Sequence, residues 1–179
     1  MATRRTIAAA CGVLAMVMCL VVPTNAAPGA SLSLEMSGTF APSVTPGPLS
    51  VLGSGTITGT FDLQRFEQRA NAGLQASGKL AIVLRNASGT ALRTLILPDA
   101  VIPVNSDLIS AAGNCEMLHL DFGPGNLDLA GLQLSLSQLA TEVIVDPTDP
   151  LARLICDIDG STSTNEIIRL LNKFLGAIS

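Results

Sequence analysis

The chain has no tryptophan and no tyrosine, and its only aromatic residues are five phenylalanines. Proteins that bind sugars or single-stranded nucleic acids commonly stack their ligands on aromatic rings, so this scarcity argues against both classes. Charged residues are also few, and acidic ones outnumber basic ones by 14 to 10. An acidic chain lacks the positive surface that attracts phosphate backbones. We therefore expect no nucleic-acid partner.

Histidine occurs once, as His119. A zinc site normally needs several His or Cys ligands, which argues against zinc. A Ser-His-Asp triad that used His119 with Asp121 or Asp128 has no nucleophile-elbow motif to supply its serine. The same two acids flank a Gly-Pro-Gly turn, but glycosidase chemistry usually also involves an aromatic-lined cleft. We expect no catalytic residue, no cofactor and no enzymatic activity, and we interpret His119 as a surface residue on a strand.

The first 26 residues have the three parts of a secretory signal. Arg4 and Arg5 form a positive start, residues 7–22 are apolar, and residues 24–26 (Thr-Asn-Ala) resemble a cleavage site. The apolar run is shorter than the roughly 20 residues of a membrane span, so we expect cleavage after Ala26 and no stable membrane span afterwards. An uncleaved anchor is the alternative. The paired arginines also fit a loose twin-arginine signal, which leaves the export route open.

Export implies a secreted, periplasmic or cell-envelope location, and it also changes the charge. Cleavage after Ala26 removes Arg4 and Arg5, which leaves 8 basic residues against 14 acidic ones and a net charge of about −6. The same cleavage removes Cys11 and Cys19, so that Cys115 and Cys156 are the cysteines expected in the mature protein.

The mature chain begins with residues 27–54, which we predict to be a strand followed by a proline-rich segment. Apolar and polar residues alternate over 31–36, as in a half-buried strand. Residues 41–49 contain three prolines and a glycine, which favours a loop or an edge segment. Hydrophobic residues make up 48% of the whole chain, enough for one domain with an aliphatic core.

Residues 55–179 are predicted to form a β domain with a helix at the end. Alternation runs from Ile57 to Leu63 and then slips before Phe66, which predicts a bulge near Arg65. A second run ends at the turn residues 86–89, and further strand-like segments lie on both sides of Pro98. Residues 86–88 (Asn-Ala-Ser) match a glycosylation sequon, but we interpret them as a hairpin turn.

The second half of this domain lies between the two remaining cysteines. Leucines alternate with polar residues on both sides of the turn at 123–126, and apolar residues at 151–158 recur with helical spacing. In an oxidising compartment Cys115 and Cys156 are expected to form a disulfide. Two free buried thiols are the alternative.

The spacing in this half resembles a family of uncharacterised bacterial secreted proteins. The pattern reads C-x-x-L-x-L-x-F-G-P, then L-x-L-x-G-L-x-L-x-L, and ends in L-x-x-L-I-C at Cys156. The preceding segment, with G-T-F-D-L-Q-R-F followed by G-K-L-A-I-V-L, resembles the same family, so the resemblance extends over residues 55–158. It departs at 146–150, where the family has a more glycine-rich turn, and at Ala130, where a leucine is usual. The family has no known activity, so the resemblance implies no catalytic or ligand-binding residue.

The C-terminal segment predicts an amphipathic helix over residues 164–176. Ser163 and Glu166 fit a capping box, and apolar residues from Ile167 onward recur on one face. We expect this helix to dock on the sheet. A helix that contacts a partner or a membrane is the alternative, although its two cations give thin support for membrane attachment.

Oxygen-bearing side chains alternate just before this helix. Asp157, Asp159 and Ser161 resemble the start of a calcium loop. The motif then lacks its glycine, because Thr162 stands at the sixth position, and its final glutamate, because Ile168 stands at the twelfth. We therefore treat these three residues as weak calcium candidates and expect no metal site.

Together these patterns predict a single, mainly β domain: an antiparallel β-sandwich or a partly closed barrel with one C-terminal amphipathic helix. The corresponding function is a secreted, non-enzymatic structural or binding module of unknown partner. The alternative is a carrier that encloses an apolar small molecule or lipid in a β-lined cavity.

Overall fold

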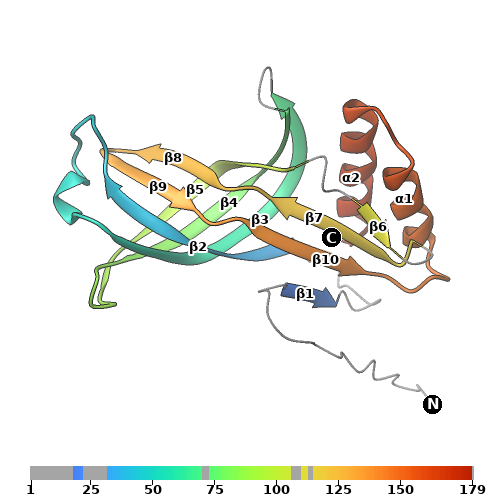
Figure 1. Cartoon of the computed structure of the whole chain (residues 1–179), viewed down its shortest axis with the longest axis horizontal. Coiled ribbons are helices and arrows are strands. Elements are labelled where there is room, and N and C mark those ends of the chain that lie inside the picture. The colour runs from blue at the N-terminus through green and yellow to red at the C-terminus, as the bar shows by residue number, and fades with distance from the viewer. Residues whose placement is uncertain (1–17, 22–31, 70–72, 106–109, 113–114, 179) are drawn as a thin grey trace, which may run out of the picture.

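The computed structural model describes residues 18–21, 32–69, 73–105, 110–112 and 115–178, and these residues form mainly β structure (Figure 1). The strands are β1 (Met18–Val21), β2 (Leu32–Pro42), β3 (Gly55–Arg69), β4 (Gly73–Arg85), β5 (Ala91–Pro103), β6 (Ser110–Ala112), β7 (Met117–Phe122), β8 (Gly125–Leu129), β9 (Leu132–Leu136) and β10 (Leu139–Ile144). The helices are the 3-10 helix η1 (Ser50–Leu52), α1 (Pro150–Asp159) and α2 (Thr164–Ile178).

The main sheet is antiparallel and has the strand order β5-β4-β3-β2-β9-β8. It curls into a half-barrel, which confirms the predicted mainly β class. A smaller sheet has the order β1-β10-β7-β6. Its strand β1 pairs in parallel with β10 and lies within the predicted signal; residues 1–17 and 22–26 of that signal lie outside the described residues.

Strand β2 lies in the interior of the main sheet, between β3 and β9. Residues 32–42 therefore share one sheet with strands from the segment that begins at residue 55. The proline-rich stretch after β2 forms a loop and η1, as its composition predicted, and the strand is longer than the alternation over 31–36 indicated. The predicted bulge is confirmed, because the register between β3 and β4 shifts between Leu63 and Arg65.

Alternation along each strand produces a single aliphatic core. On β4, Leu80, Ile82 and Leu84 are fully buried on the concave face, while Lys79 lies exposed on the opposite face. The buried residues of the two sheets and of both helices belong to one hydrophobic cluster. The fold is therefore a single packed unit in its described part.

Glycines on the concave face allow the strong curl. A Cβ at Gly59 would overlap the carbonyl oxygen of Ala81, and a Cβ at Gly78 would overlap that of Asp62. In both cases the obstacle is backbone of the neighbouring strand, which cannot rotate away as a side chain can. The absence of a side chain at these positions therefore lets adjacent strands bend toward each other.

The main sheet and the smaller sheet meet at one point. Val104, just after β5, forms a β-bridge with Phe122, the last residue of β7. The N–H of Gly123 donates to the carbonyl of Pro103 at 3.0 Å, and the N–H of Asn105 donates to that of Asp121 at 2.9 Å. Beyond this junction, β5 and β8 are the two outer strands of the main sheet and do not pair with each other, so the barrel is only partly closed.

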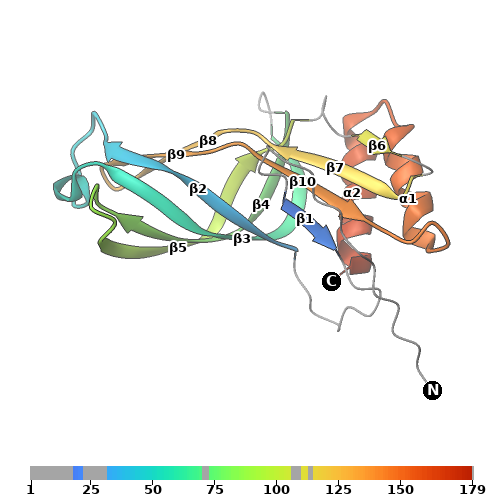
Figure 2. The same ribbon diagram turned by 60° about the horizontal axis from the view of Figure 1, so that its bottom comes forward.

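The structure contains two α-helices where the fold prediction named one. Helix α1 begins at Asp149, whose carboxylate accepts from the N–H of Leu151 at 2.9 Å, with Pro150 in the first turn. Helix α2 extends to Ile178 and passes through Gly176, where the sequence predicted its end. Both helices stand at one end of the elongated sheet, and α2 packs against α1 and β3 (Figures 1 and 2).

The predicted capping box of α2 is replaced by another interaction. The carbonyl of Ser163 accepts the bond from the N–H of Ile167 that opens the helix. However, both carboxylate oxygens of Glu166 accept from Arg169, one turn further along. Glu166 therefore contributes an ion pair on the helix surface.

Candidate functional site

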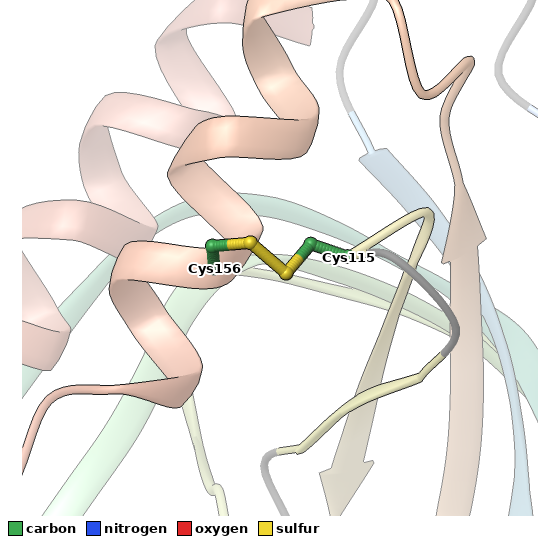
Figure 3. Close-up of a disulfide and its surroundings, with 2 residues drawn as sticks. All are labelled: Cys115 and Cys156. Carbon is green, nitrogen blue, oxygen red and sulfur yellow. A yellow bond between two sulfur atoms is a disulfide. The ribbon is translucent and has the colours of Figure 1, made fainter.

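The disulfide predicted from the cysteine pair is present (Figure 3). Cys115 lies in the turn between β6 and β7, and Cys156 lies on α1, with their Cα atoms 5.2 Å apart. The bond links two positions 41 residues apart in sequence. It therefore fastens the helical end of the molecule to the smaller sheet.

Cys115 also has an unusual backbone conformation. Its φ angle is +64°, in the left-handed region that non-glycine residues rarely occupy. Glu116 follows it, and the carbonyl of Glu116 accepts a bond from Val145 N–H at 2.8 Å. The disulfide and this hydrogen bond hold the turn in place.

The three weak calcium candidates do not form a loop. Asp157 and Asp159 lie in the last turn of α1, and Ser161 follows two residues later. Residues two positions apart on a helix are about 200° apart around its axis, so these two carboxylates point in different directions. Among the described residues, no group of three or more His, Cys, Asp or Glu side chains is arranged to hold a metal ion.

The residues considered for a catalytic triad are distributed over two sheets. His119 and Asp121 lie on β7, whereas Asp128 lies on β8, where it accepts from the hydroxyl of Ser43 at 3.3 Å. His119 instead faces Glu142 across the β7–β10 pair, with Nδ1 and Oε1 3.7 Å apart. The structure therefore pairs His119 with Glu142 and neither aspartate with His119.

Asp121 is a buried acid that the sequence did not single out as buried. Its side chain is only 3% exposed, and Oδ2 accepts from Nε2 of Gln138 at 2.6 Å. Its other oxygen has no hydrogen-bond partner among the described residues. No metal ligand or nucleophile is grouped with it there, so we assign this carboxylate to the junction between the two sheets.

Partly exposed leucines border the open side of the half-barrel. Leu95 and Leu97 of β5 lie opposite the buried Ile82 and Leu80 of β4. On the other side of the opening, Leu127 and Leu129 of β8 lie opposite the buried Leu134 and Leu132. All four bordering leucines pack against the core without being fully covered by it.

The end of the sheet opposite the helices carries a proline-rich loop, residues 43–54, which we call the tip loop (Figures 1 and 2). It contains two fully solvent-exposed valines, with relative exposures of 101% at Val44 and 88% at Val51. Most other large apolar side chains in the described chain are buried or partly buried. The tip loop is therefore the most prominent apolar feature of the surface.

Backbone contacts fasten the tip loop to the β8–β9 turn. Ser43 and Leu49 donate N–H bonds to the carbonyls of Gly131 and Ala130, at 2.8 and 3.0 Å. A Cβ on Gly47 would overlap the backbone of Ala130, so the two segments are in close contact. The sequence signal for this arrangement was limited to the prolines, which predicted a loop but not its attachment.

The exposed ion pairs lie elsewhere. Glu67 on β3 contacts both Arg65 and Arg69, with N–O distances of 3.2 and 3.1 Å. On α2, the hydrogen bond from Arg169 lowers the pKa of Glu166, and the same bond raises the pKa of Arg169. These groups are solvated, so they indicate surface solubility more than a chemical site.

The chain matches no protein-family model, no curated protein and no solved structure. In the described part of the chain, neither helix has the length and apolar character that crossing a membrane requires.

Proposed function

We propose that the chain is an exported, non-enzymatic structural or binding module. The observation that carries this proposal is the filled interior of the half-barrel. The concave face is covered by fully buried side chains: Phe61, Leu80, Ile82, Leu84, Leu132 and Leu134 each have no solvent-accessible surface. Side chains in this state leave no space beside them even for a water molecule, whereas a ligand pocket of typical size needs several hundred Å³.

The distribution of polar groups supports the same proposal. On β7, Asp121 bonds Gln138 and His119 faces Glu142, whereas Asp128, on β8 in the other sheet, bonds Ser43. Catalysis requires such groups to converge within hydrogen-bond reach of one reacting atom. Their separation favours a role in which the outer surface, and not a cleft, contacts the partner.

The test of export and oxidation is the intact mass of the protein recovered from its own host. We expect a chain that begins at Ala27 and lies outside the cytoplasm. Its mass should be two hydrogens below that of the reduced form, because Cys115 and Cys156 are bonded. A full-length cytoplasmic chain would overturn the exported part of the proposal.

The non-enzymatic part is tested by a broad substrate screen of wild type and a His119→Ala variant. We expect no turnover above background in either protein. Turnover by wild type that disappears in His119→Ala would overturn this part.

The second candidate function is a carrier of an apolar molecule. The observation that favours it is the opening between β5 and β8, which is bordered by Leu95, Leu97, Leu127 and Leu129. A lipid chain that entered there would need the core side chains to move apart. Native mass spectrometry of the protein from its host separates the two: the bare chain mass supports the module, and a stoichiometric apolar adduct supports the carrier.

A further inference from the structure

The tip loop combines exposure with an absence of charge. No charged residue occurs between Glu35 and Asp62, a stretch that contains the whole loop. Fully exposed apolar side chains that are scattered singly are ordinary in proteins. Two of them, Val44 and Val51, on one protruding and uncharged loop need a more specific explanation.

Part of the tip-loop backbone is paired, although the N–H groups of Val44, Val51 and Ser54 donate no bond within the described residues. Pro46 and Pro48 have no N–H to satisfy. The remaining bonds are Ser43 N–H to Gly131 O, Thr45 N–H to Ser43 Oγ, Gly47 N–H to Ser50 Oγ, Leu49 N–H to Ala130 O, Ser50 N–H to Gly47 O, Leu52 N–H to Leu49 O and Gly53 N–H to Ser50 O. Leaving water costs several kcal/mol for each unpaired backbone group, so the unpaired N–H groups must stay at the level of the headgroups while the valine side chains reach further in.

A second turn at the same end of the sheet provides a contrast. The β4–β5 turn is polar, and the Asn86 side chain accepts from the N–H groups of Ser88 and Thr90. Next to it are two cations, Arg85 at the end of β4 and Arg93 near the start of β5. This end of the molecule therefore presents the tip loop beside two guanidinium groups and one carboxylate, that of Asp128, which accepts from Ser43 of the loop.

We propose that the tip loop docks the protein on a lipid bilayer surface, with Val44 and Val51 inserted among the acyl chains and Arg85 and Arg93 at the level of the headgroup phosphates. This inference names a partner for the proposed binding module and rests on that proposal. A bilayer fits better than a protein partner because protein hot spots are usually Trp, Tyr or Arg side chains in well-packed pockets, whereas valine is under-represented among them. Protruding apolar side chains with cations beside them match the interface between acyl chains and headgroups.

The absence of tryptophan from the chain allows a direct test. The variants Val51→Trp and Ile96→Trp each introduce a single indole, the first in the tip loop and the second at an exposed site on β5. The chain recovered from its host is mixed with phosphatidylcholine vesicles, with and without phosphatidylglycerol. We expect a blue shift and quenching by brominated lipid for Val51→Trp, and neither for Ile96→Trp.

Binding without a probe is measured by vesicle flotation. The double variant Val44→Ser/Val51→Ser should lower the partition coefficient by about tenfold or more, because it removes the apolar groups of both valines. Ile96→Ser should leave the coefficient unchanged, since it removes a similarly exposed aliphatic group elsewhere. All variants share one N-terminus, so differences between them come from the substituted side chains.

Three results would overturn the proposal: no flotation of wild type, equal flotation of all variants, or a crosslinker at position 51 that captures only protein in the native host. Binding that disappears when salt is raised would also count against it, because the valines are expected to supply most of the affinity. The assay uses purified chain and is independent of export and of turnover, so its failure would leave the proposed module standing without this partner.

Discussion

The side-chain amide of Asn172 on α2 forms two hydrogen bonds with the backbone of Phe66 on β3, which donates its N–H and accepts at its carbonyl, both at 2.8 Å. Strand β2 pairs with β3 only as far as Leu63, so Phe66 lies beyond the end of that pairing. The carboxamide donates one bond and accepts one, as a peptide group in a neighbouring strand would, and takes the place of such a strand at this position. Helix α2 thereby protects an otherwise open edge of the sheet.

Asn172→Ala should destabilise the protein by about 1–3 kcal/mol, because it leaves a partly buried N–H and carbonyl without partners. Urea unfolding measures the change as a shift in midpoint. Asn126→Ala is the matched control: Asn126 is exposed and accepts only from Ser135 Oγ at 3.1 Å among its described bonds. Equal effects of the two substitutions would show that the Phe66 contact has no special role.

Removal of the Cys115–Cys156 disulfide should have a larger effect. In the chain-entropy model, a crosslink between residues 41 positions apart contributes about 4 kcal/mol by restricting the unfolded chain. We expect the double variant Cys115→Ala/Cys156→Ala to have an unfolding free energy about 4 kcal/mol lower than that of wild type, as measured by chemical denaturation. A reducing agent should lower the stability of wild type by a similar amount and leave that of the double variant unchanged. If the reducing agent also destabilised the double variant, its effect on wild type could not be assigned to this disulfide.

The pH dependence of α2 is expected to reflect Glu166. Its hydrogen bond with Arg169 lowers the carboxyl pKa below the ordinary 4.5 in the folded state. A lowered folded-state pKa adds stability that is present above about pH 4.5 and is lost as the pH falls through the lowered value. The pair is exposed, so the effect on global stability is small and decreases in salt.

An NMR titration of the Glu166 carboxyl carbon tests this directly. Arg169→Gln should return the pKa of Glu166 toward its ordinary value, because the hydrogen bond from the guanidinium group is removed. Lys173→Gln, which changes a cation further along the same helix, should leave it nearly unchanged. An unaltered titration in Arg169→Gln would contradict the assignment.

Most strands and the disulfide were predictable because they depend on local patterns. Period-two alternation locates β4. In β3, a slip in the same alternation located the bulge near Arg65. The strand around Pro98 was harder to predict, because the proline interrupts the alternation. In the structure, the register between β4 and β5 shifts at this point, and β5 continues to Pro103. Local periodicity thus does not show that the two segments flanking Pro98 belong to one strand.

The surface features depended on contacts between distant residues and were not predictable. Asn172 and Phe66 are 106 residues apart, and an asparagine in a helix carries no signal for such a bond. The sequence of the tip loop indicated turns, but the exposure of Val44 and Val51 follows from the attachment of the loop to Ala130 and Gly131. The left-handed φ values of Ala130 and Gly131, +49° and +92°, similarly belong to the hairpin that the fold requires.

The curl of the sheet provides the last prediction, because it depends on glycines that have no side chain to bury. Gly59→Ala places a Cβ against the carbonyl of Ala81 and should destabilise the protein by about 1–3 kcal/mol, as overpacked cores do. Gly176→Ala is the opposite case: this glycine lies inside α2 with no atom close to an added Cβ, and alanine there should stabilise by about 0.5–1 kcal/mol. Thermal unfolding of both variants decides the matter. If Gly59→Ala were as stable as wild type, the curl could not depend on that close approach of strands.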